Sequence, residues 1–374
     1  MHKLTFFPLG NADCCRIDLS GGQKLLFDYA AMRDADDEDD LRIDLAAAIL
    51  EDLEAAKRDS LDVVAFTHLD DDHIHGASEL FHLRHAEKYQ GEGRIKIDTL
   101  WVPAAAIVEE GCEDEDKIIR AEARYRLKQG KGIRVFSRPD KLKQWLEREK
   151  IPFESRQHLI TDAGRTVPGF TLADAGVEFF VHSPFASRLN DGSVLDRNID
   201  SLALQATFSV DGKLTRLLTL SDLDHMALSD IVDITRGKKR DDRLAWDIMK
   251  IAHHCSYTAL GPDKGKEKTE PIPNVRWLCE QASQPKAIAV SSSKLIPDED
   301  SDKQPPHRQA AAYYREQATN RSGEFIVTMA HPKAAAPEQL VIEIGGSKAK
   351  VKRGYLGGAA VIVGHSAPRA GLNG

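Results

Sequence analysis

The segment Phe66–Gly76 reads FTHLDDDHIHG and follows directly on the apolar run 61–65. It holds the densest set of potential metal ligands in the chain, and it lies where a buried strand would end and a helix begin. Histidines and carboxylates at such short spacings converge only on a sharp turn, because successive side chains of a strand point to opposite faces. Imidazole and carboxylate are the donors that a divalent hydrolytic metal site requires. The segment therefore predicts a metal-binding turn, with a solvated acidic loop as the alternative.

The pattern T-H-x-[HD]-x-D-H-x-x-G after a strand resembles the signature of the metallo-β-lactamase fold, whose usual form is T-H-x-H-x-D-H. Asp70 stands where the second histidine is usual, and this variant resembles the hydrolase domain of the competence protein ComEC. Further segments resemble the same subgroup, in the same order, over roughly residues 1–330. They are 9–13 with 25–28, 198–202, 217–222, 248–256 and Pro306-His307.

The resemblance implies an α/β fold, namely a four-layered αβ/βα metallo-β-lactamase sandwich with a helical insertion. Two mixed sheets would face each other with helices outside, and the metals would lie at an edge where strand ends converge. We expect a hydrolase domain at 1–335, with a basic helical insertion at about 105–150, and then a terminal hairpin and mobile tail at 336–374. Local patterns also predict helices at 38–57 and 77–89.

By the resemblance, His68 and Asp70 would hold one divalent ion, and Asp72 and His73 a second one. Asp222, at the end of an apolar strand, would be the bridging carboxylate. Its alternative role is helix capping, because a Ser-Asp pair before a helical run is good capping chemistry.

The pair His253-His254 ends another apolar strand. We favour His254 as a metal ligand and His253 as a contact to a substrate phosphoryl oxygen, which makes Asp72 and His253 the expected catalytic residues. Cys255 follows where the family usually has glycine. His182 ends a strand just before a proline, and we expect it to be the remaining histidine ligand rather than a surface histidine.

Replacement of a histidine by Asp70 hardens the donor set and shifts its preference from zinc towards manganese, magnesium or iron. The expected cofactors are two divalent metal ions, with manganese or zinc first and magnesium or iron as alternatives. Such a pair, about 3.5–4 Å apart, activates a water and stabilises both oxygens of an in-line displacement. That chemistry suits phosphodiesters.

The net charge of −8 gives no global attraction to nucleic acid. Residues 120–150 are nevertheless strongly basic, with Tyr125, Phe136 and Trp145 interleaved. This segment predicts either a grip on a phosphate backbone or a solvated helix face. Five cysteines without C-x-x-C spacing indicate reduced thiols. The chain shows neither a membrane-length apolar run nor a signal peptide, so we expect a cytoplasmic protein without a membrane partner.

The function predicted first is metal-dependent phosphodiester hydrolysis, most specifically by a nuclease that holds DNA through segment 120–150. One alternative is a hydrolase of a small phosphoester or cyclic nucleotide. Another, from a different class, is a regulatory subunit with a degenerate metal site and a protein partner.

Overall fold

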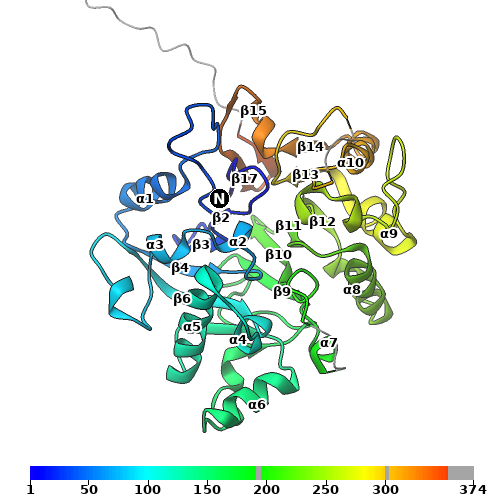
Figure 1. Cartoon of the computed structure of the whole chain (residues 1–374). Helices are drawn as coiled ribbons and strands as arrows, with labels where there is room; N and C mark the ends of the chain where they lie inside the picture. The colour runs from blue at the N-terminus through cyan, green and yellow to red at the C-terminus, as the bar shows by residue number, and fades with distance from the viewer. Residues whose placement is uncertain (191–194, 300–302, 353–374) are drawn as a thin grey trace, which may run out of the picture.

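The computed structural model describes residues 1–190, 195–299 and 303–352 (Figure 1). The strands are β1 (His2–Phe6), β2 (Cys15–Asp18), β3 (Lys24–Phe27), β4 (Ser60–Ala65), β5 (Phe81–His82), β6 (Ile95–Pro103), β7 (Ile133–Phe136), β8 (Ile160–Thr161), β9 (Val177–Ser183), β10 (Ala203–Val210), β11 (Lys213–Thr219), β12 (Trp246–Lys250), β13 (Ser283–Ser291), β14 (Glu324–Val327), β15 (Pro332–Lys333), β16 (Ala336–Pro337), β17 (Leu340–Gly345) and β18 (Lys348–Val351). The α-helices are α1 (Leu45–Ala55), α2 (Asp71–Ile74), α3 (Ala77–Leu80), α4 (Ala105–Val108), α5 (Asp114–Gln129), α6 (Asp140–Arg148), α7 (Ala186–Asn190), α8 (His225–Gly237), α9 (Pro273–Glu280) and α10 (Arg308–Asn320).

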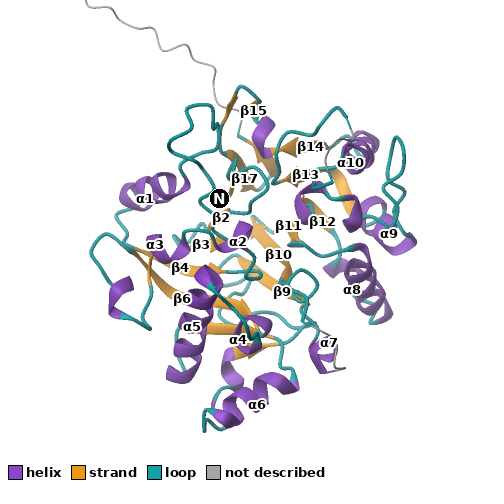
Figure 2. Ribbon diagram, viewed as in Figure 1, coloured by secondary structure: helices purple, strands orange, loops and turns teal. Residues whose placement is uncertain are grey.

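Two large sheets carry the fold. The first has the order β18-β17-β1-β2-β3-β4-β6-β7-β8, with β5 beside β6, and the second has the order β14-β13-β12-β11-β10-β9. Both sheets mix parallel and antiparallel pairs: β3 and β4 run parallel, for example, whereas β1 and β2 run antiparallel. Figure 2 shows the strands in the middle of the molecule, with helices on either side.

Three apolar cores separate four layers. One core packs α1, α5 and α6 against the outer face of the first sheet. The second lies between the sheets, where the ring of Trp101 meets those of Phe27 and Phe179 edge-on at 6.0 and 5.4 Å between centroids. The third packs α8, α9 and α10 against the second sheet. Burial of both faces of each sheet is what makes its strands predominantly apolar. The predicted four-layered αβ/βα sandwich is confirmed.

Some local predictions are wrong. The helix predicted over 77–89 ends at Leu80, and Phe81-His82 forms strand β5, which pairs with β6. The segment 105–150, expected to be a basic helical insertion, contains α4, α5 and α6, but β7 lies between α5 and α6 and pairs in parallel with β6. Short apolar runs such as these fit a helix or a strand equally well, so that pairing partners decide between them.

The predicted terminal hairpin is present as β17 and β18. Strand β17 pairs antiparallel with β1, so the hairpin extends the first sheet. The mobile tail predicted beyond it falls on 353–374, outside the described residues. Within the described ranges, no helix combines the length and the apolar character needed to cross a bilayer.

Candidate metal centre

Potential ligand atoms from four loops meet at one edge of the two sheets. Asp13, His73, Asp222 and His254 are buried, and each offers an atom within 4.8 Å of the others'. His73 also forms a second such group with His68 and Asp72. The contributing loops precede β2 and follow β4, β11 and β12, so both sheets take part. The turn predicted from the first sequence motif is therefore one part of a larger cluster.

His73 is held by a carboxylate that the sequence did not single out as functional. Its Nδ1 lies 3.0 Å from Oδ2 of Asp28, and its Nε2 lies 3.5 Å from Oδ1 of Asp222. Asp28 also accepts hydrogen bonds from the backbone N and the Oγ1 of Thr67, at 2.7 and 2.8 Å. A carboxylate on one ring nitrogen fixes the tautomer and leaves the other nitrogen for a metal.

The other two imidazoles are oriented in the same way. His254 donates from Nδ1 to the carbonyl oxygen of Ser292 at 2.7 Å, and its Nε2 lies 3.0 Å from Oδ2 of Asp72. The Nδ1 of His68 lies 3.3 Å from both Thr67 Oγ1 and Ser221 Oγ. Each histidine thus presents Nε2 towards the neighbouring carboxylates.

The residues fit divalent ions. Among the described residues, the buried Nε2 atoms of His68 and His73 and the Oδ1 atoms of Asp13 and Asp222 have no hydrogen-bond partner. Leaving a polar atom buried and unpaired costs about 1–3 kcal/mol. Nitrogen and carboxylate oxygen atoms that face one another without partners are the donor set of a zinc-type or manganese-type site.

The electrostatics of the cluster follow from its acids. Burial alone would lower the pKa of His254, but Asp222 and Asp72 raise it to about 10. For His73, Asp28 and Asp222 overcome the same effect of burial and raise the pKa well above its usual value. Burial opposes ionisation of Asp222, whose pKa is nevertheless held well below its usual value by His254 and His73. Metal binding here would release protons from the histidines.

Asp70 lies at the rim of the cluster. One carboxylate oxygen is 3.5 Å from Nε2 of His68, and the other accepts from Nη1 of Arg197 at 3.1 Å. Arg197 also pairs with Glu109 and Asp116. These contacts place the α4–α5 segment against the turn Phe66–Gly76, which we call the metal turn. Neither of the two ligand groups formed by the described residues includes Asp70.

The structure does not bring His182 to the cluster. Its Nε2 donates to the carbonyl oxygen of Arg243 at 2.8 Å, and burial lowers its pKa to about 4. Alternation along β9 explains this position, because Val181 faces the core between the sheets and His182 faces the opposite side. There His182, Phe180 and Arg240 line a cavity of about 190 Å³.

His253 lies beside the cluster rather than in it. Its side chain is half-buried, its ring centroid is 6.3 Å from that of His254, and its Nδ1 lies 3.5 Å from Thr258 Oγ1. Cys255 is fully buried in the core against α8–α10, and burial raises the pKa of its thiol to about 12. His254, not His253, therefore offers the ligand atom, and Cys255 points into the core.

Left-handed backbone occurs at several non-glycine residues around the cluster. Asp28 has φ 59°, Ser221 47°, and the consecutive residues His253, His254 and Cys255 have φ of 50°, 49° and 66°. Non-glycine residues in this region cost of order 1–3 kcal/mol each and persist where the surroundings fix them. The loops thus hold their side chains in a tightly constrained arrangement, as is usual for functional sites.

Sequence reasoning also missed Asp13 and Lys250 as site residues. Lys250, at the end of β12, forms a buried ion pair with Asp13, which reaches it from 237 residues away in the chain. A lone lysine in the apolar run Trp246–Ile251 was the available signal, because lysine is almost never fully buried without a partner.

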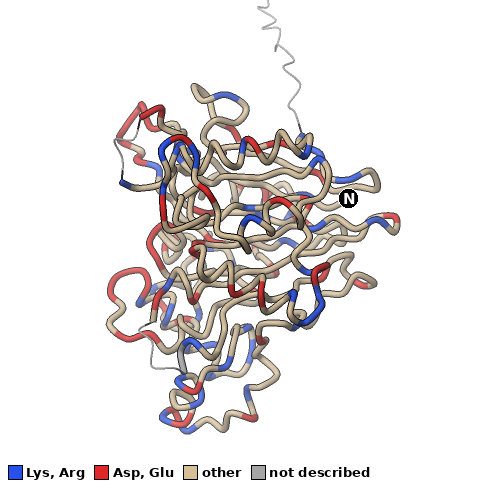
Figure 3. Tube along the Cα trace, turned by 90° about the vertical axis from the view of Figure 1, so that its right-hand side faces the viewer, with Lys and Arg blue, Asp and Glu red and all other residues tan. Residues whose placement is uncertain are grey.

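Most of the described cations of segment 120–150 have acidic partners. Figure 3 shows blue and red stretches interspersed along the chain rather than a single basic face. The pairs are Arg120 and Arg124 with Glu110, Arg126 with Glu122, Lys128 with Glu149, Arg138 with Asp162, and Lys143 with Asp140.

No protein-family model and no curated protein matches this chain. Among solved structures, the chain is similar to unliganded yeast PDE1, with a TM-score of 0.44 and 10% identity over 87% of this chain and 96% of that one. It is also similar to metallo-β-lactamase SMB-1 bound to 2-mercaptoethanesulfonate, with a TM-score of 0.28 and 12% identity over 67% of this chain and 79% of that one. A third similarity is to the class B3 di-zinc metallo-β-lactamase LRA-12 from an Alaskan soil metagenome, with a TM-score of 0.29 and 12% identity over 83% of this chain and 84% of that one.

Proposed function

We propose that this protein is a metal-dependent phosphodiester hydrolase. The observation that carries the proposal is the buried convergence of three histidine Nε2 atoms with the carboxylates of Asp13, Asp72 and Asp222. A buried cluster of this composition is suited to holding divalent ions.

Two divalent ions, manganese or zinc first, would be held by the cluster residues. These are His68, Asp72, His73, Asp222 and His254, with Asp13 beside them and Asp70 at the rim. When bound, such ions supply a water of lowered pKa and positive charge beside the oxygens of a phosphodiester.

The chain itself orients the ligand side chains and compensates their charge. Asp28 and the carbonyl oxygen of Ser292 fix the rings of His73 and His254, and Lys250 compensates the buried charge of Asp13. His253, half-buried at the margin of the cluster, would contact a phosphoryl oxygen of a substrate that enters from that side. Ligands held in this way need little reorganisation when substrate binds.

DNA is the substrate that we propose first. Its phosphate contacts would be the cations of segment 120–150, other than Lys131, that form no ion pair among the described residues. These are Arg134, Lys141, Arg148 and Lys150. A small phosphoester is the second candidate. It is favoured by the contact of Arg197 with both Asp70 and the α4–α5 segment, which narrows one side of the rim.

The test is hydrolysis of labelled single- and double-stranded DNA, and of bis-(p-nitrophenyl) phosphate, with Mn²⁺, Mg²⁺ or Zn²⁺. The variant Asp72→Ala/His73→Ala should lose all activity, whereas His75→Ala should keep it, because His75 is exposed and pairs only with Asp71 among described residues. DNA cleavage supports the nuclease, and cleavage of the small ester alone supports the second candidate. If the protein bound no divalent ion, both hydrolase proposals would be wrong and the regulatory alternative would be favoured.

A further inference from the structure

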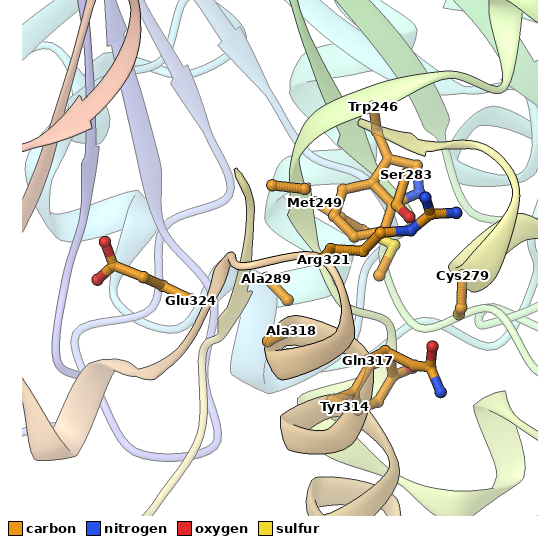
Figure 4. A pocket seen from close by; sticks show the side chains of 11 residues that line it. Trp246, Met249, Cys279, Ser283, Ala289, Tyr314, Gln317, Ala318, Arg321 and Glu324 are labelled. Atoms are coloured by element: carbon orange, nitrogen blue, oxygen red, sulfur yellow. The ribbon is translucent and has the colours of Figure 1, made fainter. Parts of the chain in front are cut away.

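The cavities of this protein differ greatly in size and lining. The crevice in Figure 4 lies beside Trp246, Met249 and Tyr314 and measures about 10 Å³, which is room for one water at most. A second cavity, of about 340 Å³, is lined by cationic and polar side chains, including Arg84, Arg126 and Lys131. We call it the cationic cavity. None of its described lining residues is acidic.

The cationic cavity is separate from the metal centre. Strand β4 runs from Ser60 to Ala65, and the metal turn follows its carboxyl end. Ser60 at the other end pairs with Lys96 of β6, next to the carbonyl oxygen of Ile97 that Arg84 and Arg126 contact. The cavity therefore lies towards the opposite edge of the first sheet.

Arg126 is built into this cavity as a buried cation. Its side chain is 1% exposed, Nε donates to Oε1 of Glu122 at 2.6 Å, and Nη1 donates to the carbonyl oxygen of Gly132 at 2.8 Å. Its buried Nη2 has no hydrogen-bond partner among the described residues. An arginine that is buried this far usually has all its donors paired, so the charge of Arg126 is incompletely compensated at the wall of the cavity.

Gly132 lets a second guanidinium approach the first. It has φ +71°, and a Cβ there would come within 3.0 Å of Nη1 of Arg84 and 3.4 Å of Nη1 of Arg126. The nearby carboxylate of Glu122 is already occupied, because it also accepts from the backbone N and the Nδ1 of His85 at 2.9 and 3.0 Å. Two like charges are thus held together, and Glu122 is the only carboxylate that forms an ion pair with either of them among the described residues.

The excess of positive charge in the cationic cavity indicates an anionic ligand. Glu122 offsets Arg126, whereas Arg84 and Lys131 have no carboxylate within 4.0 Å among the described residues. We propose that the cationic cavity binds a phosphate dianion, either free or as the terminal group of a small phosphomonoester. Guanidinium groups recognise such oxygens through paired, charge-assisted hydrogen bonds.

The test is calorimetric titration of inorganic phosphate into the full chain at constant ionic strength. It uses the Asp72→Ala/His73→Ala background with chelator, so that the metal centre cannot take up phosphate. Saturable binding is expected. Lys131→Gln and Arg84→Gln should each weaken it about tenfold, the effect of one charge-assisted hydrogen bond. The control is Lys117→Gln, which removes an exposed charge from helix α5 outside the cavity and should leave the affinity for phosphate unchanged.

Further arms distinguish the two sources of the dianion. Tighter binding of deoxyadenosine monophosphate than of phosphate assigns a phosphomonoester, and equal affinities assign free phosphate. Deoxyadenosine without phosphate should not bind. The proposal is overturned if phosphate shows no saturable binding, or if Lys131→Gln binds it as well as Lys117→Gln does.

Discussion

The Nδ1 atom of His73 lies 3.0 Å from Oδ2 of Asp28, at the end of a strand that neighbours the one carrying the metal turn. Because Asp28 also binds the backbone and hydroxyl of Thr67, the carboxylate connects the ring to the strand that precedes it. The orientation of the buried imidazole is thus set by a residue that is itself held in place.

Replacing Asp28 by asparagine should weaken metal binding about 10–100-fold, since partners of this kind orient a ligand and raise its basicity. Competition with a chelator of known affinity measures the effect. Asp59→Asn is the control, because Asp59 is exposed and pairs with Lys96 far from the cluster. Equal metal affinity in the two variants would contradict the role of Asp28.

The buried pair of Lys250 and Asp13 should show strong coupling in the metal-free protein. Lys250→Met removes the closest counter-charge of the buried Asp13 carboxylate, whose other ion partner is His73 at 3.7 Å. We expect a loss of about 3–5 kcal/mol in the free energy of unfolding. The double variant Lys250→Met/Asp13→Asn should recover at least about 1 kcal/mol of that loss. Urea unfolding of the parent, of Lys250→Met, of Asp13→Asn and of the double variant measures the coupling. Strictly additive effects would show that the two charges do not interact.

Glu122 should make stability depend on acid pH. Burial opposes its ionisation, but His85 and Arg126 lower its pKa to about 2 from an ordinary 4.5. A lowered pKa in the folded state means that the stabilisation is fully present above pH 4.5 and is lost as the pH falls towards 2. Its size is about 3 kcal/mol.

Glu122→Gln should therefore lower stability at pH 7 by about that amount and flatten the dependence of stability on pH below 4.5. Free energies of unfolding in urea between pH 2.5 and 7 provide the measurement. Glu147→Gln, an exposed change on α6, should leave the profile as it is. If the free energy of unfolding of Glu122→Gln still fell as steeply with decreasing pH as that of the parent, Glu122 would not be the source of the pH dependence.

Metal should stabilise the folded chain by mass action. With Mn²⁺ or Zn²⁺ at one hundred times its dissociation constant, the free energy of unfolding should rise by about 2.7 kcal/mol, and a chelator should reverse the rise. His73→Ala should abolish the effect, and His75→Ala should retain it, since only His73 belongs to the buried groups. If metal stabilised both variants equally, the ion would bind outside the cluster around His73.

The sequence was most informative where local pattern and chemistry coincide. The metal turn, Asp222 and the choice of His254 over His253 were all predicted from a strand followed by ligand residues, and the structure places these side chains together. The layered fold was expected from the family resemblance that these motifs carry.

What the sequence could not provide were relations across the chain. Asp13 and Lys250 are 237 residues apart, and nothing local indicates that they meet. His182 was placed on the wrong face, since both faces of β9 are covered and Phe180 is as buried as Val181. Alternation of polar and apolar residues distinguishes the faces only where one of them meets water.

The cluster contains side chains from loops of both sheets. Asp72 and His254, which are 182 residues apart, come from different sheets and lie within hydrogen-bond distance of each other. An ion held there would cross-link the two sheets, which otherwise contact each other through the core around Trp101 and Phe179. Sliding of one sheet over the other would move Asp222 and His254 relative to the four donors of the first sheet's loops. The affinity for the ion therefore reports the relative position of the two sheets. Substitutions in the core between the sheets should change that affinity even where they lie far from any ligand residue.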